Sequence, residues 1–210
     1  MVWTVMFMKK GMKRIGICLL AVLAVWAGTL LADRKRLNEE LIRLHVVANS
    51  DSREDQDIKL LVRDAVTNSL RRDLESMKDV EQAKRYLTEN LPKIQAIANG
   101  ALEQAGFSGE AVASLCHEAF DTRYYDTFTL PAGVYEALRI TIGKGEGHNW
   151  WCVVFPTLCV PATTEGFADT AAGAGFPDSL TGALTGQEEY EVRFYILDAL
   201  GRVENYFFPR

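Results

Sequence analysis

The first pattern along the chain is a run of uncharged residues from Ile15 to Ala32 (IGICLLAVLAVWAGTLLA). As a helix, these residues would span about 27 Å, close to the roughly 30 Å hydrocarbon core of a bilayer. A buried core helix would carry polar flanks, whereas this run follows basic residues near the N-terminus. We therefore predict a basic cytoplasmic leader (1–14), a signal peptide or transmembrane anchor (15–32) and a charged juncture (33–40).

The charges around this run decide neither its orientation nor its cleavage. The four basic residues that precede it are matched by Arg34, Lys35, Arg36 and Arg43, which follow closely, so the positive-inside rule gives almost a tie. No clean Ala-x-Ala site is present, which leaves cleavage open. Because large downstream domains cross membranes largely regardless of charge, we expect residues 41–210 to form a single extracytoplasmic domain.

That domain begins with a strand in which apolar and polar positions alternate. Within residues 41–47 (LIRLHVV), Leu44 and Val46 share one face, and Arg43 and His45 share the other. Such alternation has the period of a β-strand, so we predict a strand here.

A helix is predicted after the turn at residues 49–51. Ser52 with Asp55, or Asp51 with Glu54, fits a capping box, and acidic residues suit the positive end of a helix dipole. The apolar positions then recur at helical spacing: Ile58, Leu61, Val62, Ala65, Val66 and Leu70.

A second helix is predicted over residues 80–105. Its apolar positions are Ala83, Leu87, Leu91, Ile94, Ala98 and Leu102. Pro92 lies inside this repeat and would either kink the helix or break it. Each predicted helix has one apolar stripe, which suits packing on a sheet.

Beyond the helices the period changes to two. Strands are predicted through residues 116–124, 134–142 and 150–155, and GKGEGHN (143–149) has the composition of a hairpin turn. The Gly/Ala-rich stretch 162–188 shows little periodicity and is predicted as a loop. In the closing segment (190–198), alternating Tyr190, Val192, Phe194 and Ile196 predict a final strand. This order of elements is typical of an α+β fold with helices packed on an antiparallel or mixed sheet.

Charge narrows the classes of partner. The chain carries a formal charge of -5, but all charged residues among 1–32 are basic, so the rest of the chain is more acidic than this total. An acidic body lacks the clustered Lys and Arg that phosphate backbones require, so we expect no nucleic acid partner.

Catalytic patterns are weak. His45 with Asp51 and Asp55 could form a base with carboxylate partners, but these acids suit a helix N-terminus better. Cys152 has no His close by in sequence, and no GxSxG elbow is present. The acids at 51–57 lack the Gly and terminal Glu of a calcium loop, and the glycines at 143–147 lack the end of a phosphate-binding loop. We therefore predict no catalytic residue, no metal site and no cofactor.

Two surfaces are more typical of recognition than of packing. The candidate partner-binding residues are Asp51, Asp55, Gln56, Lys59, Arg63, Asn149, Trp150 and Trp151. Gln56, Lys59 and Arg63 recur at helical spacing opposite the apolar stripe, where a solvated face is the simpler interpretation. Adjacent strand residues face opposite ways, so Trp150 or Trp151 should face outward, either covered by the loop or offered to a partner.

The cysteines leave two alternatives open. Cys152 and Cys159 would lie more than about 20 Å apart in an extended chain, whereas a disulfide needs Cα atoms about 4.4–6.8 Å apart. A bridge therefore requires the chain to fold back near Pro156. Two buried free thiols are the alternative, and Cys116 is a competing partner.

Three segments resemble one family. LIRLHVVANSDSREDQDIKLLVRDAV (41–66) and LPAGVYEALRITIGKGEGHNWWCVVFPTLC (130–159) are similar to stage II sporulation protein R of endospore-forming bacteria. VRFYILD (192–198) is similar to the C-terminal strand of that family. The 162–188 stretch departs from the family pattern.

The resemblance implies a secreted signalling protein, made in the forespore and sent into the space between forespore and mother cell. There it would activate a membrane-embedded aspartic protease of the mother cell, which processes the pro-form of sigma factor E. The chain would then be an activator without catalytic residues, and charge reversal at Lys59 and Arg63 should weaken activation without disturbing the fold. The alternatives are a small extracytoplasmic hydrolase using His45 or Cys152, and a membrane-anchored ligand-binding module with a deep aromatic pocket near Trp150.

Overall fold

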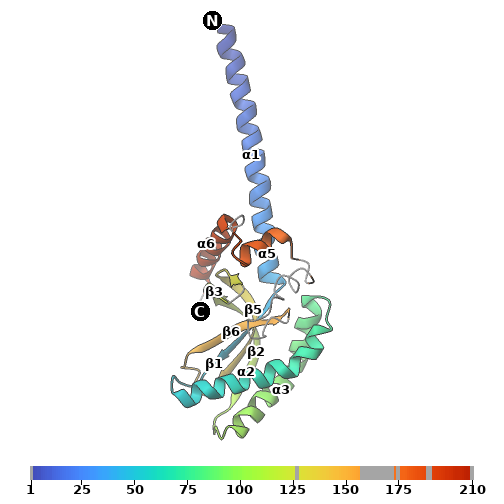
Figure 1. Cartoon of the computed structure of the whole chain (residues 1–210), viewed down its shortest axis with the longest axis vertical. Coiled ribbons are helices and arrows are strands. Elements are labelled where there is room, and N and C mark those ends of the chain that lie inside the picture. Colours follow the sequence, from blue (N-terminus) through green and yellow to red (C-terminus); the bar gives the residue numbers. More distant parts are fainter. Residues whose placement is uncertain (1, 126–127, 157–172, 174–175, 188–190, 209–210) are drawn as a thin grey trace. The chain divides into compact units, whose positions relative to one another are not determined.

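The computed structural model describes residues 2–125, 128–156, 173, 176–187 and 191–208 (Figure 1). In chain order the elements are α1 (Val2–Glu39), β1 (Ile42–Val47), α2 (Arg53–Glu75), α3 (Val80–Gln104), β2 (Ala111–Phe120), β3 (Arg123–Tyr124), β4 (Thr129–Leu130), β5 (Gly133–Ile142), β6 (Asn149–Phe155), α5 (Asp178–Leu184) and α6 (Glu191–Phe207). The chain divides into two compact units, Met1–Lys35 and Arg36–Arg210.

The uncharged run lies inside α1. The stretch Arg14–Glu39 is long and apolar enough to cross a membrane by length and composition, and only 6% of its most apolar window is buried. This exposure separates it from the core helix of a soluble protein, which would be mostly buried. A signal sequence near the N-terminus has the same properties, so α1 suits either a signal peptide or an anchor.

The second unit is built on a four-stranded mixed sheet in the order β2-β5-β1-β6. β1 runs parallel to β5 and antiparallel to β6, with Leu44 opposite Leu138 on one side and Cys152 on the other. β2 pairs antiparallel with β5. The predicted α+β class with a mixed sheet is therefore confirmed. β1 is central, so every residue of this strand is buried.

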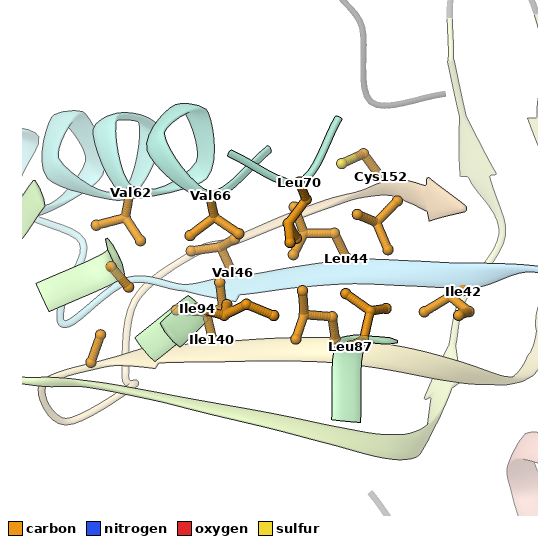
Figure 2. Close-up of a cluster of buried hydrophobic side chains, with 14 of the residues drawn as sticks. Ile42, Leu44, Val46, Val62, Val66, Leu70, Leu87, Ile94, Ile140 and Cys152 are labelled. Carbon is orange, nitrogen blue, oxygen red and sulfur yellow. The ribbon is translucent and has the colours of Figure 1, made fainter. Parts of the chain in front are cut away.

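One face of this sheet forms the hydrophobic core beneath α2 and α3. Figure 2 shows side chains from the sheet meeting side chains from both helices. The labelled members are Ile42, Leu44, Val46, Val62, Val66, Leu70, Leu87, Ile94, Ile140 and Cys152. Burying a side chain of this kind contributes about 1.5–3 kcal/mol, which makes this layer the main source of stability in the domain.

Local signals set the helix ends as predicted. Ser52 is the N-cap of α2, and its Oγ accepts a hydrogen bond from the Asp55 N–H at 3.1 Å. Asp79 caps α3 and accepts from the Gln82 N–H at 2.8 Å. α3 continues through Pro92, so this residue does not break the helix.

The predicted hairpin at 143–149 is wrong. β5 and β6 are not neighbours, because β1 lies between them in the sheet. The connection instead crosses the C-terminal end of β1, where the Gly147 N–H donates to Ala48 O at 3.0 Å. Gly143 and Gly145 have φ angles of +56° and +65°, which favour glycine in this crossing.

The strand predicted through residues 116–124 divides in two. β2 ends at Phe120, and Tyr124 belongs to β3, which pairs with β4 in a separate two-stranded sheet. The period-two pattern of side chains continues from β2 into β3, so the sequence pattern does not reveal where β2 ends.

The closing segment is a helix, so the predicted final strand is wrong. In α6, Leu197, Asp198 and Gly201 are buried, at spacings of three and four residues. The alternation fits a strand when only residues 190–198 are considered. The buried positions that extend beyond residue 198 follow the spacing of a helix instead. Helix α5 lies within the predicted loop, so that part of the loop prediction is wrong. Leu180, Ala183 and Leu184 are buried at helical spacing along α5. Residues 162–172 of that loop lie outside the described residues.

Candidate functional site

The face of the sheet turned away from α2 and α3 carries charged and aromatic side chains. In β1 the alternation that places Leu44 in the core places Arg43 and His45 on this opposite face. Arg43 is 0% exposed and His45 is 5% exposed. Burying such groups costs free energy unless partners compensate, so their contacts define the site.

Arg43 is held mainly by aromatic rings. Its guanidinium carbon lies 4.1 Å from the centre of the Phe120 ring and 5.0 Å from that of Tyr135. Its Nη2 donates a hydrogen bond to the Tyr125 hydroxyl at 2.9 Å. Nε and Nη1 have no hydrogen-bond partner among the described residues. Cation–π contacts of this kind are favourable when desolvated, but they do not replace the missing acceptors.

His45 is oriented by a carboxylate. Its Nδ1 lies 2.8 Å from Glu118 Oε2, and the other oxygen of Glu118 accepts from Arg139 Nη1 at 3.2 Å. Because an ionised carboxylate only accepts hydrogen bonds, Nδ1 carries a proton, and Nε2 is then an acceptor whenever the ring holds a single proton. That Nε2 is buried and has no hydrogen-bond partner among the residues that the structure describes.

A small pocket lies beside this histidine. Its volume is about 130 Å³, and its lining includes His45, Glu118, Phe120, Arg123, Asn149 and Trp151. The rings of His45 and Trp151 stack with centres 5.5 Å apart, and the guanidinium carbon of Arg123 lies 3.4 Å from the centre of the Trp151 ring. The pocket therefore combines an aromatic wall with an unpaired acceptor on a buried ring.

The geometry limits what this pocket can do chemically. The pair of His45 and Glu118 is the arrangement of a general base and its orienting group. The residues that line the pocket within the described part of the chain include no Ser, Thr or Cys to serve as a nucleophile. Asp51 and Asp55, the carboxylates considered and rejected as partners of His45, bond to other groups in the turn before α2.

The volume of the pocket can be compared with the alternative function of a ligand-binding module. Sites for drug-sized ligands have volumes of about 300–1,000 Å³, several times that of this pocket. The pocket lies beside Trp151, whereas Trp150 packs against the helix-covered core. Trp150 therefore does not line this pocket. The space suits one side chain of a partner.

Two candidate residues near the start of α2 form hydrogen bonds within the domain. Gln56 Nε2 donates to Ser50 O at 2.9 Å, and Lys59 Nζ donates to His148 O at 3.0 Å. Lys59 is only 6% exposed, and this burial lowers the pKa of its ammonium group. The interpretation of a solvated face is wrong for Lys59, because the chain at the start of β6 covers this side of the helix.

Arg63 and Trp150 form a contact on the same side of the sheet. The guanidinium carbon of Arg63 lies 4.2 Å from the centre of the Trp150 ring. As predicted from strand alternation, Trp150 and Trp151 face opposite sides of the sheet, since Trp150 pairs with Arg63 and Trp151 with His45. The structure thus separates the predicted Asn149–Trp151 neighbourhood into a structural half and a pocket-lining half.

Two acidic candidates hold the turn before α2. Asp55 Oδ2 accepts from Ser50 Oγ at 2.5 Å and from Asn49 Nδ2 at 2.9 Å, and these hydrogen bonds lower the pKa of the Asp55 carboxyl. Asp51 is exposed and accepts from the His148 backbone N–H at 2.6 Å. Its pKa is lowered by the hydrogen bonds from the side chain and backbone of His148.

The cysteines differ in state. Cys152 is disulfide-bonded and 6% exposed, which is incompatible with a nucleophilic role. Cys18 and Cys116 are free. Cys159 lies outside the described residues, so its pairing with Cys152 stays a prediction. The pKa of Cys116 is raised chiefly by burial, which disfavours a reactive thiolate. No group of His, Cys, Asp or Glu in the searched part of the chain could hold a metal ion.

Sequence reasoning missed Glu118, Arg123 and Arg139. One signal was available: Arg43 and His45 interrupt an otherwise apolar strand, and buried ionisable residues of this kind need partners. The partners come from β2, β3 and β5, which are distant in sequence, so only the tertiary structure identifies them.

Comparison with known proteins gives a consistent result. A family model described as stage II sporulation protein R matches residues 38–165. Stage II sporulation protein R of Bacillus subtilis (strain 168) is 40% identical over 121 residues, which are 58% of this chain and 54% of that protein. The aligned part therefore spans about half the length of this relative. No solved structure matches.

The region matched by the family model contains β1 to β6 and the pocket. It ends before α5, so the similarity of 192–198 to a family strand is not supported.

Proposed function

Because the chain belongs to the stage II sporulation protein R family, we propose that it is an exported signal in endospore formation. In this proposal the forespore sends the chain into the space between forespore and mother cell. There it activates a membrane-embedded aspartic protease of the mother cell, which then processes the pro-form of sigma factor E. The chain acts as a ligand of the protease and not as the catalyst.

Export is supported by the apolar stretch of α1. A helix of this length and composition, preceded by basic residues, suits either a signal peptide or an anchor. A disulfide at Cys152 is also more common in proteins that leave the reducing cytoplasm. Both features favour placing the unit Arg36–Arg210 on the outer side of the membrane.

The observation that carries a docking site is the unpaired Nε2 of His45. A buried acceptor without a donor costs about 1–3 kcal/mol, so a partner that supplies an N–H or O–H would recover this free energy on binding. Trp151 and Arg123 form an aromatic and cationic wall beside it, and Trp and Arg are enriched among residues that dominate interface energies. We propose that one donor side chain of the protease enters this pocket.

The test is co-expression of this chain with the protease and the pro-sigma substrate, scored as the fraction of substrate processed. The wild-type chain should support processing. His45→Gln and Trp151→Ala should reduce it at least tenfold, because they alter the acceptor and the wall of the pocket. Lys93→Ala is the control, since Lys93 is exposed on α3 and does not line this pocket. Circular dichroism should show that all three variants are folded.

The outcomes separate the function from the site. If the wild-type chain gives no processing, the signalling function is wrong. If wild type is active and the folded pocket variants are as active as Lys93→Ala, the function stands and the pocket is not the docking site.

A second candidate function rests on the pair of His45 and Glu118, which resembles a general base and its orienting carboxylate. The discriminating experiment replaces the catalytic aspartates of the protease in the same co-expression. Signalling predicts that processing stops completely. Processing that continues in the presence of this chain would identify the chain as the catalyst.

A further inference from the structure

The outward side of α6 is apolar. Val192, Tyr195, Val203, Tyr206 and Phe207 are 65%, 63%, 58%, 84% and 76% exposed. Their spacing of three, four or eight residues places them on one stripe of the helix. A surface helix of a soluble domain normally shows the opposite pattern, with its polar side turned to water. Contiguous exposed apolar surface of this kind marks a contact with a membrane or a partner.

The inward side of α6 is fixed by specific contacts. Asp198 Oδ1 accepts from the Ala132 N–H at 2.8 Å and from Thr122 Oγ1 at 2.5 Å. Asn205 Nδ2 donates to Phe120 O at 2.7 Å. These bonds lie on the buried side of the helix, so the apolar stripe cannot turn inward without breaking them. The hydrogen bonds of the buried side therefore hold the apolar stripe on the outside of the domain.

The chain itself limits how far α6 can lie from a membrane. α6 packs closely on the turn at Ala132 and Gly133, since a Cβ at Gly201 would collide with the Ala132 carbonyl. A Cβ at Gly133 would lie 3.4 Å from Asn38 Oδ1. Asn38 follows Ala32, the last residue of the uncharged run, by six positions. Six residues reach at most about 20 Å even when fully extended, so this turn must stay close to the membrane surface.

The chemistry of the stripe suits a lipid surface. Tyr195 and Tyr206 combine an apolar ring with a polar hydroxyl, which suits the boundary between headgroups and acyl chains. Amphipathic helices that lie in this boundary bury a face rich in Trp, Phe or Leu. Arg34, Lys35 and Arg36 next to the uncharged run would attract anionic headgroups to the same place.

We propose that α6 lies on the membrane surface with its apolar stripe among the lipid headgroups and upper acyl chains. This contact is separate from the pocket beside His45, and it rests on α1 remaining in the membrane as an anchor rather than being removed as a signal peptide. It gives the unit Arg36–Arg210 a second attachment to the membrane in addition to the leader. α6 lies outside the region matched by the family model, so the contact does not follow from family membership.

The test uses the full chain reconstituted in vesicles of phosphatidylcholine and phosphatidylglycerol that contain a photoactivatable phosphatidylcholine. After irradiation, mass spectrometry locates the lipid adducts. Adducts are expected on residues 192–207 as well as on the uncharged run. Leu61 of α2 is 52% exposed and serves as an internal control, because α2 should carry no adduct.

Two variants test the stripe itself. Val203→Glu combined with Tyr206→Glu should reduce the adducts on α6 at least fivefold while leaving those on residues 15–32 unchanged. Both positions are exposed, so the melting temperature should also stay unchanged. Leu61→Glu is the matched control and should leave the labelling of α6 as in wild type.

Each other outcome overturns the proposal in a distinguishable way. Adducts on the uncharged run without any on α6 would show that the stripe does not touch lipid. An absence of adducts on both segments would show that the membrane association of α1 is itself wrong.

Discussion

Replacing Gly201 with alanine should weaken the packing of α6 on the turn before β5. A Cβ at this position would collide with the carbonyl of Ala132 and lie 3.1 Å from the Gly133 nitrogen. These are backbone atoms, which cannot rotate aside as a side chain would, so α6 must shift. Overpacking of this kind typically costs about 1–3 kcal/mol.

The chain offers a matched control in Gly100 of α3. A Cβ at Gly100 would meet nothing within 4 Å. Replacing glycine by alanine inside a helix stabilises it by about 1 kcal/mol, and this gain applies equally at both positions. The difference in the free energy of unfolding between Gly100→Ala and Gly201→Ala therefore measures the cost of the collision alone.

Thermal unfolding of the full chain in detergent, followed by circular dichroism, checks this prediction. For a domain of this size, each kcal/mol corresponds to about 2–4 °C. Gly100→Ala should raise the melting temperature by about that amount, and Gly201→Ala should unfold roughly 2–12 °C below Gly100→Ala. Equal melting temperatures for the two variants would refute the close packing of α6 on Ala132.

Three further predictions concern the start of α2. Lys59→Glu should destabilise the domain by about 3 kcal/mol or more, because it leaves a buried carboxylate beside the His148 carbonyl; urea unfolding should show no comparable loss for Lys93→Glu at an exposed site. The hydrogen bonds that lower the pKa of Asp55 stabilise the fold above about pH 4, and this contribution is lost as pH falls through the folded-state pKa. Melting temperatures measured across acidic pH should accordingly fall less steeply for Asp55→Asn than for wild type, and identical slopes would contradict this role. Arg63→Ala should cost about 0.5–1 kcal/mol by removing the contact with Trp150, and a stability unchanged from wild type would show that this contact is unimportant.

The prediction for Lys59 revises an expectation from the sequence. Charge reversal at Lys59 was expected to leave the fold intact, because helical spacing placed this residue opposite the apolar stripe. In the structure Lys59 reaches the His148 carbonyl and is covered by the start of β6. A helical wheel defines the sides of a helix, but it does not show how much of the circumference the neighbouring elements cover.

The error at the C-terminus has a similar origin. The alternation of Val192, Phe194 and Ile196 has the period of a strand, and over so few residues it also fits one turn and a half of helix. The stripe that the structure leaves on the outside of α6 made this ambiguity worse, because apolar residues occupy both sides of the helix.

The sequence by itself determined the elements whose signals are local. The uncharged run, the N-cap at Ser52 and most of the core faces of β1, α2 and α3 depend on neighbouring residues only, and these were predicted correctly. Leu61, predicted on the apolar stripe of α2, is instead 52% exposed. Only the tertiary structure decided the position of β1 between β5 and β6, because strand order depends on pairing between distant segments. The pocket follows from that order, since His45, Glu118 and Arg123 come from three different strands. Contacts between distant segments leave no periodic trace in the sequence, so the identity of the site emerged only from the folded sheet.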